Sequence, residues 1–288
     1  MAGHELEGND MNEVINCLPK VTVIIVTYNS GEKLKSTVDS ALSQTYSNVE
    51  VLVKDGLSND GSTSFLSNGA YTRNVAFYSE KDYGIYDAMN RAIDIASGDY
   101  IIFINSGDRF HTYSSLEITM DFIIQDERKH DIYYGDNFTC NRNAVTYSPK
   151  KLTNYICFRG VIGHQTMLYS AKVFETLKYD LRFPISACIT HYITAFRRYH
   201  MTFKYVPVVI SDYEGGGISD CAAGRKRSIQ DVRICLHEEY GLAYYWYAFL
   251  MVISLRRLKQ WLSTLEWFEP VYRKLTILFK GKRPKRES

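Results

Sequence analysis

The chain has 288 residues, enough for one large domain or for one domain with a substantial appendage. Its 34 basic and 32 acidic side chains give a formal charge of +2, which argues against a broadly basic nucleic-acid-binding protein. The content of 45% hydrophobic and 23% charged residues is typical of soluble globular proteins, not of disordered ones. No uninterrupted apolar run reaches the roughly 18 residues that a membrane-spanning helix needs.

The ends and the cysteines of the chain indicate a reducing compartment. The first ten residues, MAGHELEGND, are polar and acidic, unlike a secretory signal. The six cysteines are scattered and contain no C-x-x-C pair, which argues against a disulfide framework or a thiolate zinc site. We therefore expect a cytoplasmic protein whose residues 1–19 form a disordered lead-in.

The first hundred residues alternate between strand and helix patterns. VTVIIVT at 21–27 is a continuous β-branched run, typical of a strand buried on both faces of a parallel sheet. Asn29 and Ser30 offer N-caps to the helix that follows. Further strands are predicted at 49–54, 75–79 and 100–104, with a helix at about 84–97. This alternation predicts an α/β fold with a doubly wound parallel sheet.

The second half of the chain has a looser pattern. It predicts, in chain order, a helix at 114–125, a strand at 131–135, a strand and then a helix within 161–177, a strand at 203–211, and helices over 224–280. Pro207 is expected at a sheet edge, because proline lacks the backbone N–H that a central strand uses. We infer one α/β domain over 20–222 and a helical, basic extension over 223–288.

Polar side chains follow each of the first four predicted strands. These segments are 27–30 (TYNS), 55–60 (DGLSND), 79–82 (SEKD) and 105–108 (NSGD). In an open parallel sheet, ligands bind beyond the carboxyl ends of the strands. Four such segments in succession predict a ligand pocket at this edge.

The predicted pocket is acidic, which constrains its ligand. The chain has no G-x-x-x-x-G-K-[ST] loop, and no G-x-G-x-x-G follows the first strand, so glycine amides do not cradle a phosphate there. An acidic pocket repels a diphosphate unless a divalent cation bridges the two. Mg²⁺ or Mn²⁺ does this with one or two carboxylates and phosphate oxygens, and Asp108 is the best candidate ligand.

Four blocks of sequence together resemble family 2 glycosyltransferases of the GT-A fold. The blocks are VTVIIVTYNS at 21–30, DGLSNDGS at 55–62, SEKDYGIYDAMN at 79–90 and GDYIIFINSGD at 98–108. The bacterial exopolysaccharide and colanic-acid-type branch is the most similar. The resemblance implies a Rossmann-like, mostly parallel central sheet flanked by helices. It continues more thinly through His164-Gln165 and 215–219.

The resemblance also implies roles for residues at the strand ends. The nucleotide-sugar site would comprise Thr27, Tyr28, Asp55, Ser58, Asp60, Asp82, Asp87 and Asn105. Asp55 would accept a hydrogen bond from the base, commonly uracil, and Asp82 and Asp87 would face the donor sugar or ribose. Asn105 begins the segment that stands where the family carries its D-x-D motif, which leaves Asp108 as the one metal carboxylate. Asp60 fits a helix N-cap equally well, and Asp87 fits a solvated helix surface.

The chain departs from the family where the catalytic base is expected. Inverting transfer needs a base for the acceptor hydroxyl, and the family places an aspartate in the segment that corresponds to 184–192. No Asp or Glu occurs between Asp180 and Asp212. Three alternatives remain: His191 is the base, since imidazole has a suitable pKa; Asp180, Asp212 or Glu214 reaches in; or the protein binds a nucleotide sugar without transferring it.

The C-terminal segment combines aromatic and basic residues. LAYYWYAFLMVI at 242–253 is apolar and aromatic, and residues 251–288 carry ten Lys or Arg against three Glu, a local charge of +7. Such a segment can lie in a membrane interface. The alternative is a helix that packs on the domain, followed by a solvated tail.

These observations lead to one main hypothesis and one alternative. We expect a hexosyl-type glycosyltransferase that moves one sugar, with inversion, from a nucleotide-diphosphate donor, most simply a UDP-sugar. The acceptor would be a growing surface or exopolysaccharide saccharide on a lipid carrier, met at the cytoplasmic face of the cell membrane. No nucleic-acid partner is expected. The alternative is a non-catalytic nucleotide-sugar-binding protein of the same pathway.

Overall fold

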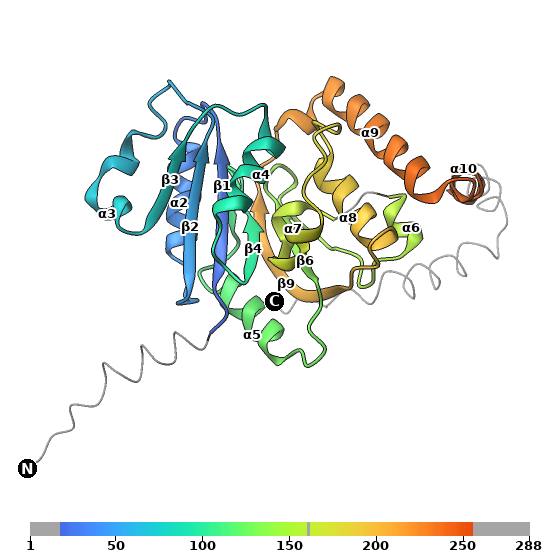
Figure 1. Ribbon diagram of the computed structural model, residues 1–288, viewed down its shortest axis with the longest axis horizontal. Helices are drawn as coiled ribbons and strands as arrows, with labels where there is room; N and C mark the ends of the chain where they lie inside the picture. The colour runs from blue at the N-terminus through green and yellow to red at the C-terminus, as the bar shows by residue number, and fades with distance from the viewer. Residues whose placement is uncertain (1–17, 160–161, 256–288) are drawn as a thin grey trace, which may run out of the picture.

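The computed structural model describes residues 18–159 and 162–255, and these form one mixed β-sheet flanked by helices (Figure 1). The strand order is β3-β2-β1-β4-β8-β6-β9-β5, with β7 paired to β6. The strands are β1 (Val21–Thr27), β2 (Val49–Asp55), β3 (Val75–Ser79), β4 (Tyr100–Phe103), β5 (Arg109–Phe110), β6 (Ile132–Thr139), β7 (Ala144–Thr146), β8 (Met167–Ser170) and β9 (Phe203–Tyr213). The α-helices are α2 (Lys33–Leu42), α3 (Gly69–Thr72), α4 (Ile85–Ile95), α5 (Ser115–Gln125), α6 (Asn154–Cys157), α7 (Lys172–Thr176), α8 (Ala187–Arg197), α9 (Ala222–Tyr240) and α10 (Ala243–Leu255).

The first four strands are parallel, as the alternation of strand and helix patterns predicts. All seven residues of β1 are buried, because helices cover both faces of the sheet there. Ile24 and Val26 pack with Met89 of α4 on one face. Val23 and Ile25, which point the other way, pack on the opposite face in the cluster that contains α2. Burial on both faces explains why this strand has no polar alternation.

The second half of the sheet is mixed. Strand β8 inserts between β4 and β6 and is antiparallel to both, while β9 is parallel to β6 and antiparallel to β5. Pro207 is exposed and lies at an irregularity on the β6 side of β9, where the register shifts between Tyr134/Tyr205 and Asp136/Val209. On the other side, β9 pairs with β5 only at Ser211 and Asp212, so among the described residues no strand lies beside Pro207 there, as expected at a sheet edge. An irregularity of this kind accommodates proline for the same reason that an edge does, because no ladder hydrogen bond requires its N–H.

The C-terminal part is helical through Leu255, and residues 256–288 lie outside the described chain. Helix α9 joins the domain through Cys235, Leu236 and Tyr240, which are buried in the main core. Figure 1 shows α9 and α10 at the end of the molecule opposite β3 and α3. Among the described residues, no helix combines the length and the hydropathy needed to cross a bilayer. The lead-in predicted over 1–19 also falls mostly outside the described residues.

Gly98, between α4 and β4, is packed so closely against the backbone that a larger side chain should destabilise the fold. A Cβ on Gly98 would lie 2.6 Å from the backbone nitrogen of Thr22 and 2.8 Å from the carbonyl oxygen of Tyr100. Rigid backbone atoms cannot yield as a flexible side chain does. We expect Gly98→Ala to lower the free energy of unfolding by about 2 kcal/mol, as measured by urea denaturation. Gly69→Ala is the control, because nothing lies within 4 Å of its Cβ position. Equal stability of the two variants would contradict the close approach.

Candidate active site at the carboxyl ends of the parallel strands

The loops after β1 and β2 are joined by hydrogen bonds. Gly56 N donates to the carbonyl of Thr27 at 3.0 Å, and Asn29 N donates to Ser58 Oγ at 2.8 Å. Asp60 Oδ2 accepts from Gly31 N at 3.0 Å, and Oδ1 accepts from Ser62 N at 3.0 Å. The hydrogen bonds from Ser62 lower the pKa of Asp60. Asp60 therefore connects the two loops, and Tyr28, on the first of them, is exposed.

Asp55, at the end of β2, is only 1% exposed and is held from two sides. Its Oδ1 accepts from Ser58 Oγ at 2.5 Å, and its Oδ2 accepts from Ser79 Oγ at 2.6 Å. Ser79 ends β3, so three of the four predicted segments meet around this carboxylate. A side chain fixed in this way has one orientation. It is therefore better suited to recognise a planar nucleobase than an aspartate that only stabilises a turn.

Lys54, which the sequence reasoning missed, lies beneath these loops. Its side chain is completely buried, and its Nζ donates to the carbonyls of Asp55 and Glu80, both at 2.9 Å. The same Nζ lies 3.8 Å from Asp82 Oδ2. A lone lysine next to a run of apolar strand residues is a sequence signal that could have identified it, because a buried ammonium needs several acceptors.

Asp82 and Asp87 lie at the start of α4. Asp82 Oδ1 accepts from Gly84 N at 3.0 Å. Asp87 Oδ2 accepts from Tyr83 N and from Arg91 Nε, both at 3.0 Å. Both carboxylates therefore help to order the turn that leads into the helix, and both are mostly buried, each side chain being 13% exposed. Asp82 lies against the loop that follows β2, since its Oδ2 is 3.8 Å from Lys54 Nζ and would be 2.7 Å from a Cβ on Gly56.

Asn105 follows β4 and pairs with His164. Their Nδ2 and Nε2 atoms are 2.8 Å apart. Burial lowers the pKa of His164 to about 4, so the ring is neutral near pH 7 and its Nε2 can accept from the Asn105 amide. Asn105 Oδ1 is buried, and no partner for it occurs among residues 18–159 and 162–255. An amide oxygen without a partner is available to a ligand.

Asp108 is the most unusual carboxylate of the site. It is 5% exposed, and its Oδ1 accepts from Glu214 N at 3.0 Å. Burial and the charges of Glu214 and Asp212 together raise its pKa to about 7, against the opposing effects of the hydrogen bond from Glu214 N and of the charge of Lys33. Gly107 leaves room for this arrangement, since a Cβ there would lie 2.2 Å from Glu214 Oε2. A buried carboxylate beside two others favours a bound cation.

The donor set fits a hard divalent cation. Asp108 and the free oxygen of Asn105 supply oxygen ligands of the kind that Mg²⁺ and Mn²⁺ prefer. The described part of the chain contains no group of three or more His, Cys, Asp or Glu residues arranged to hold a metal. One protein carboxylate is the usual situation when substrate phosphates complete the coordination.

Two of the proposed acids lie beside Asp108, and the third does not. Asp212 and Glu214 both act on the pKa of Asp108. Asp212 Oδ1 lies 2.6 Å from His111 Nδ1, and Glu214 Oε2 lies 2.7 Å from Lys33 Nζ. Asp180 instead pairs with Arg182 on the neighbouring chain segment. Sequence spacing does not show the Asp212–His111 contact, because β5 and β9 are far apart in the chain.

The structure corrects the placement of His191. The side chain lies inside the core on α8, where its Nε2 donates to the carbonyl of Leu177 at 2.9 Å among Tyr169, Phe174 and Tyr179. Burial lowers its pKa to about 4. The ring is therefore removed from the strand ends and is not placed to take a proton from an acceptor. Cys188, near the expected family aspartate, lies 3.1 Å from Tyr86 Oη.

The site thus gathers most of the predicted residues at one edge of the sheet. Thr27, Tyr28, Asp55, Ser58, Asp60 and Asp82 lie on the connected loops of β1, β2 and β3. Asp87 lies in the first turn of α4, where it accepts a hydrogen bond from Tyr83 N. Asn105, Asp108 and Asp212 lie at the ends of β4 and β9.

Comparisons with known proteins identify the family and the fold of the chain. The family profile named Glycosyl transferase family 2 matches residues 22–202. The "PGL/p-HBAD biosynthesis glycosyltransferase" of Mycobacterium bovis is 29% identical over 206 residues, which cover 70% of this chain and 80% of the relative. The Escherichia coli protein "UDP-Glc:alpha-D-GlcNAc-diphosphoundecaprenol beta-1,3-glucosyltransferase WfaP" is 32% identical over 122 residues, 36% of this chain and 49% of the relative.

Solved structures share the fold at low sequence identity. The fragment 1–349 of Staphylococcus aureus TarS, in complex with UDP, superposes with a TM-score of 0.62 at 15% identity, covering 90% of this chain and 79% of that fragment. Glucosyl-3-phosphoglycerate synthase from Mycobacterium tuberculosis, solved with Mn²⁺ and UDP, gives a TM-score of 0.57 at 14% identity, covering 82% of this chain and 86% of that one. The predicted GT-A fold is confirmed.

The raised pKa of Asp108 predicts a pH-dependent stability in metal-free buffer. The unfolded chain ionises Asp108 near pH 4, but the folded chain keeps the proton until about pH 7. The charged carboxylate therefore destabilises the fold progressively as the pH rises through this window. We expect the stability advantage of Asp108→Asn over wild type to grow by about 2 kcal/mol between pH 5 and pH 8, as measured by denaturation with EDTA. Asp121→Asn, an exposed substitution on α5, is the control. A pH-independent difference would contradict the burial of the charge.

Proposed function

Because the chain belongs to Glycosyl transferase family 2, we propose that it moves one hexosyl unit from a nucleotide-diphosphate sugar, with UDP as the nucleotide, to a saccharide acceptor. The observation that carries the proposal is the junction of two features at one sheet edge. The first is the pair of connected loops around Asp55. The second is the buried Asp108 with the amide oxygen of Asn105, which has no hydrogen-bond partner in the described part of the chain. One feature suits a base and ribose, and the other suits a metal-bound diphosphate.

The nucleotide half of the site would be formed by the loops of β1, β2 and β3. The exposed ring of Tyr28 offers a stacking face to a base, and the fixed carboxylate of Asp55 offers an acceptor to an imide N–H such as that of uracil. Lys54, through Asp82 and the loop carbonyls, would keep these groups in place.

The diphosphate half would be formed by Asp108 and Asn105. A divalent cation, Mg²⁺ or Mn²⁺, would be held by Asp108 and would neutralise the charge that develops on the leaving diphosphate. The chain's own contribution is orientation: Glu214 N and Thr37 Oγ1 fix Asp108 through its side chain and its carbonyl. Lys33, paired with Glu214, adds a positive side chain at the same place.

We propose Asp212 as the base of an inverting transfer. The acceptor hydroxyl would lose its proton to Asp212 as its oxygen bonds to the anomeric carbon, and the bond from that carbon to the diphosphate oxygen would break. Asp212 lies close enough to Asp108 for its charge to raise the pKa of Asp108. The Oδ1 atom of Asp212 is held by His111 Nδ1. The carboxylate is partly exposed, as a base that meets an incoming acceptor must be.

We propose a lipid-carrier-linked saccharide of a surface or exopolysaccharide as the acceptor. The support is the name of the relative WfaP, which specifies a diphosphoundecaprenol-linked acceptor, together with the aromatic and basic C-terminal segment. The enzyme would then work as a peripheral protein at the cytoplasmic face of the cell membrane.

The donor proposal predicts metal-assisted nucleotide binding. By titration calorimetry, we expect Mn²⁺ to raise the affinity for UDP by about tenfold or more, because the cation offsets repulsion between the diphosphate and Asp108. Asp108→Asn should lose this Mn²⁺ increment, and its affinity without metal should equal or exceed that of wild type, because the repulsion by the carboxylate is removed. Asp94→Asn, an exposed substitution on α4, is the control. An Mn²⁺ increment that survives in Asp108→Asn would contradict the proposed metal ligand.

The base proposal predicts a loss of turnover without a loss of donor binding. We expect Asp212→Asn to lower kcat by about 100-fold or more, while UDP and Mn²⁺ still bind. Asp180→Asn, whose carboxylate pairs with Arg182, is the matched control. UDP release is measured with a UDP-sugar and a cell-envelope lipid extract.

Two outcomes would overturn the assignment of the base. Loss of turnover in Glu214→Gln but not in Asp212→Asn would move the role to Glu214. A wild-type protein that binds UDP with Mn²⁺ but forms no product would favour the non-catalytic nucleotide-sugar-binding alternative. The observation behind that alternative is the acid-free sequence of α8, ACITHYITAFR.

A further inference from the structure

Helix α10 and the residue before it present an exposed apolar stripe. Leu242, Trp246 and Phe249 are 88%, 61% and 54% exposed, and Tyr245 is exposed beside them. Their spacing of three or four residues places them on one face of the helix. The other face packs inward, where the rings of Tyr244 and Tyr247 lie 6.0 Å and 5.1 Å from the ring of Phe158. The stripe is therefore a separate surface and not a frayed part of the core.

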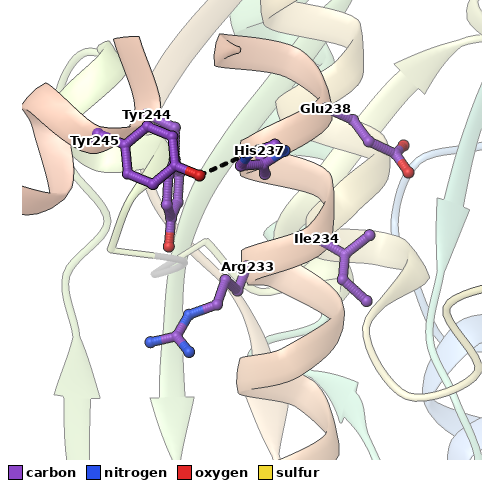
Figure 2. Close-up of a pocket in the computed structure, with 6 residues that line it drawn as sticks. All are labelled: Arg233, Ile234, His237, Glu238, Tyr244 and Tyr245. Carbon is purple, nitrogen blue, oxygen red and sulfur yellow. Dashed lines mark hydrogen bonds between the residues drawn. The ribbon is translucent and has the colours of Figure 1, made fainter. Parts of the chain in front are cut away.

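A cavity of about 520 Å³ adjoins this stripe between α9 and α10 (Figure 2). Its lining residues are Arg233, Ile234, His237, Glu238, Tyr244 and Tyr245. Figure 2 shows the Arg233 guanidinium directed to the side of the tyrosine rings, while Glu238 points away from them. Glu238 pairs with Arg182 at 3.1 Å, and His237 Nε2 lies 3.2 Å from Tyr245 Oη. In the part of the chain that the structure describes, Arg233 forms no ion pair.

Exposed residues of α9 extend the same surface. Lys226, Ile229, Arg233 and His237 follow one another at intervals of three or four residues and are all exposed. Arg227, by contrast, is paired with the buried Asp231 at 2.8 Å. The α9–α10 surface is defined by Lys226, Ile229, Arg233, His237, Leu242, Tyr245, Trp246 and Phe249. It thus combines large apolar and aromatic side chains with basic groups that form no ion pair with the residues that the structure describes.

We propose that the α9–α10 surface docks on an anionic lipid bilayer, an inference that rests on the lipid-linked acceptor of the proposed function. Trp246 and Phe249 would enter the boundary between headgroups and acyl chains, and Arg233 with His237 would hold a lipid phosphate in the cavity. Aromatic rings with a polar group and basic side chains are the combination that favours this interface. Helix α10 would lie in the plane of the membrane, since no described helix is long and apolar enough to cross it.

The charge of the chain favours this partner over a second copy of the protein. Residues 251–288, which begin within α10, carry a net charge of +7. Two copies that met through α10 would bring these charges together, whereas an anionic leaflet attracts each of them. The rest of the chain sums to −5, so the attraction is confined to the C-terminal end and would orient the domain on the membrane.

Vesicle binding of the full-length chain tests the surface. The vesicles contain phosphatidylcholine alone or phosphatidylcholine mixed with phosphatidylglycerol, and bound protein is measured by co-sedimentation. We expect wild type to bind the mixed vesicles and to bind phosphatidylcholine weakly. Trp246→Glu with Phe249→Glu should lower binding to mixed vesicles by about tenfold or more, and Arg233→Gln by a smaller factor. Ile118→Glu, an exposed apolar-to-acidic change on α5, should bind as wild type does.

Other results would overturn the docking surface. Equal binding by wild type and the Trp246/Phe249 variant would show that this stripe does not meet the bilayer. A wild-type dimer by light scattering that the same variant dissociates, without vesicle binding by either, would assign the stripe to a second copy. UDP binding with Mn²⁺ is measured on every variant. Retained nucleotide binding with lost vesicle binding supports the surface, and absent nucleotide binding in wild type contradicts the proposed function alone.

Discussion

The charge of one buried carboxylate is the constraint around which this site is organised. Asp108 lies at the end of β4, almost without access to solvent, beside Glu214 and Asp212. Removing a carboxylate from water disfavours its charged form, and two acidic neighbours disfavour it further. The backbone N–H of Glu214 and the ammonium of Lys33 offset only part of this effect, so the pKa stays near 7. A divalent cation with a diphosphate would remove the conflict, because the cation would neutralise Asp108 and the diphosphate would complete the coordination of the cation.

The loops after β1, β2 and β3, which would meet the nucleotide, are organised differently. Hydrogen bonds hold their polar groups in one orientation. Asp55 is held by two serines from two segments, and Lys54 holds the carbonyls of the same two strand ends from below. The group that would meet the base is thus fixed before the ligand arrives, and less ordering is needed on binding. In the proposed site, metal and nucleotide would be bound at the ends of parallel strands of one sheet, so the fold itself would set the distance between them.

Much of the fold could be predicted because the first half of the chain encodes it locally. A seven-residue apolar run such as β1 needs helices on both faces, and the polar segments after β1 to β4 must then meet at one edge. The second half could not be predicted in this way, because the antiparallel insertion of β8 between β4 and β6 depends on pairing with residues distant in sequence. Nothing local marks that register.

The residues of the candidate site fall into the same two groups: those that the local sequence predicts, and those whose position depends on contacts between distant parts of the chain. Asp55, Ser58 and Asp108 follow strands whose positions the sequence indicates, and the structure places them at the expected edge. The interior position of His191 depends on α7 and α8 packing their aromatic residues around the ring, which helical spacing alone does not reveal. The contact of His111 with Asp212 depends on β5 pairing with β9.

The proposed metal and nucleotide site is tested most directly by a crystal structure with UDP and Mn²⁺, in which anomalous scattering locates the metal. We expect the metal to lie about 2.1 Å from an Asp108 carboxylate oxygen and to be coordinated by the diphosphate as well. Manganese bound elsewhere, or UDP bound away from Asp55, would contradict it.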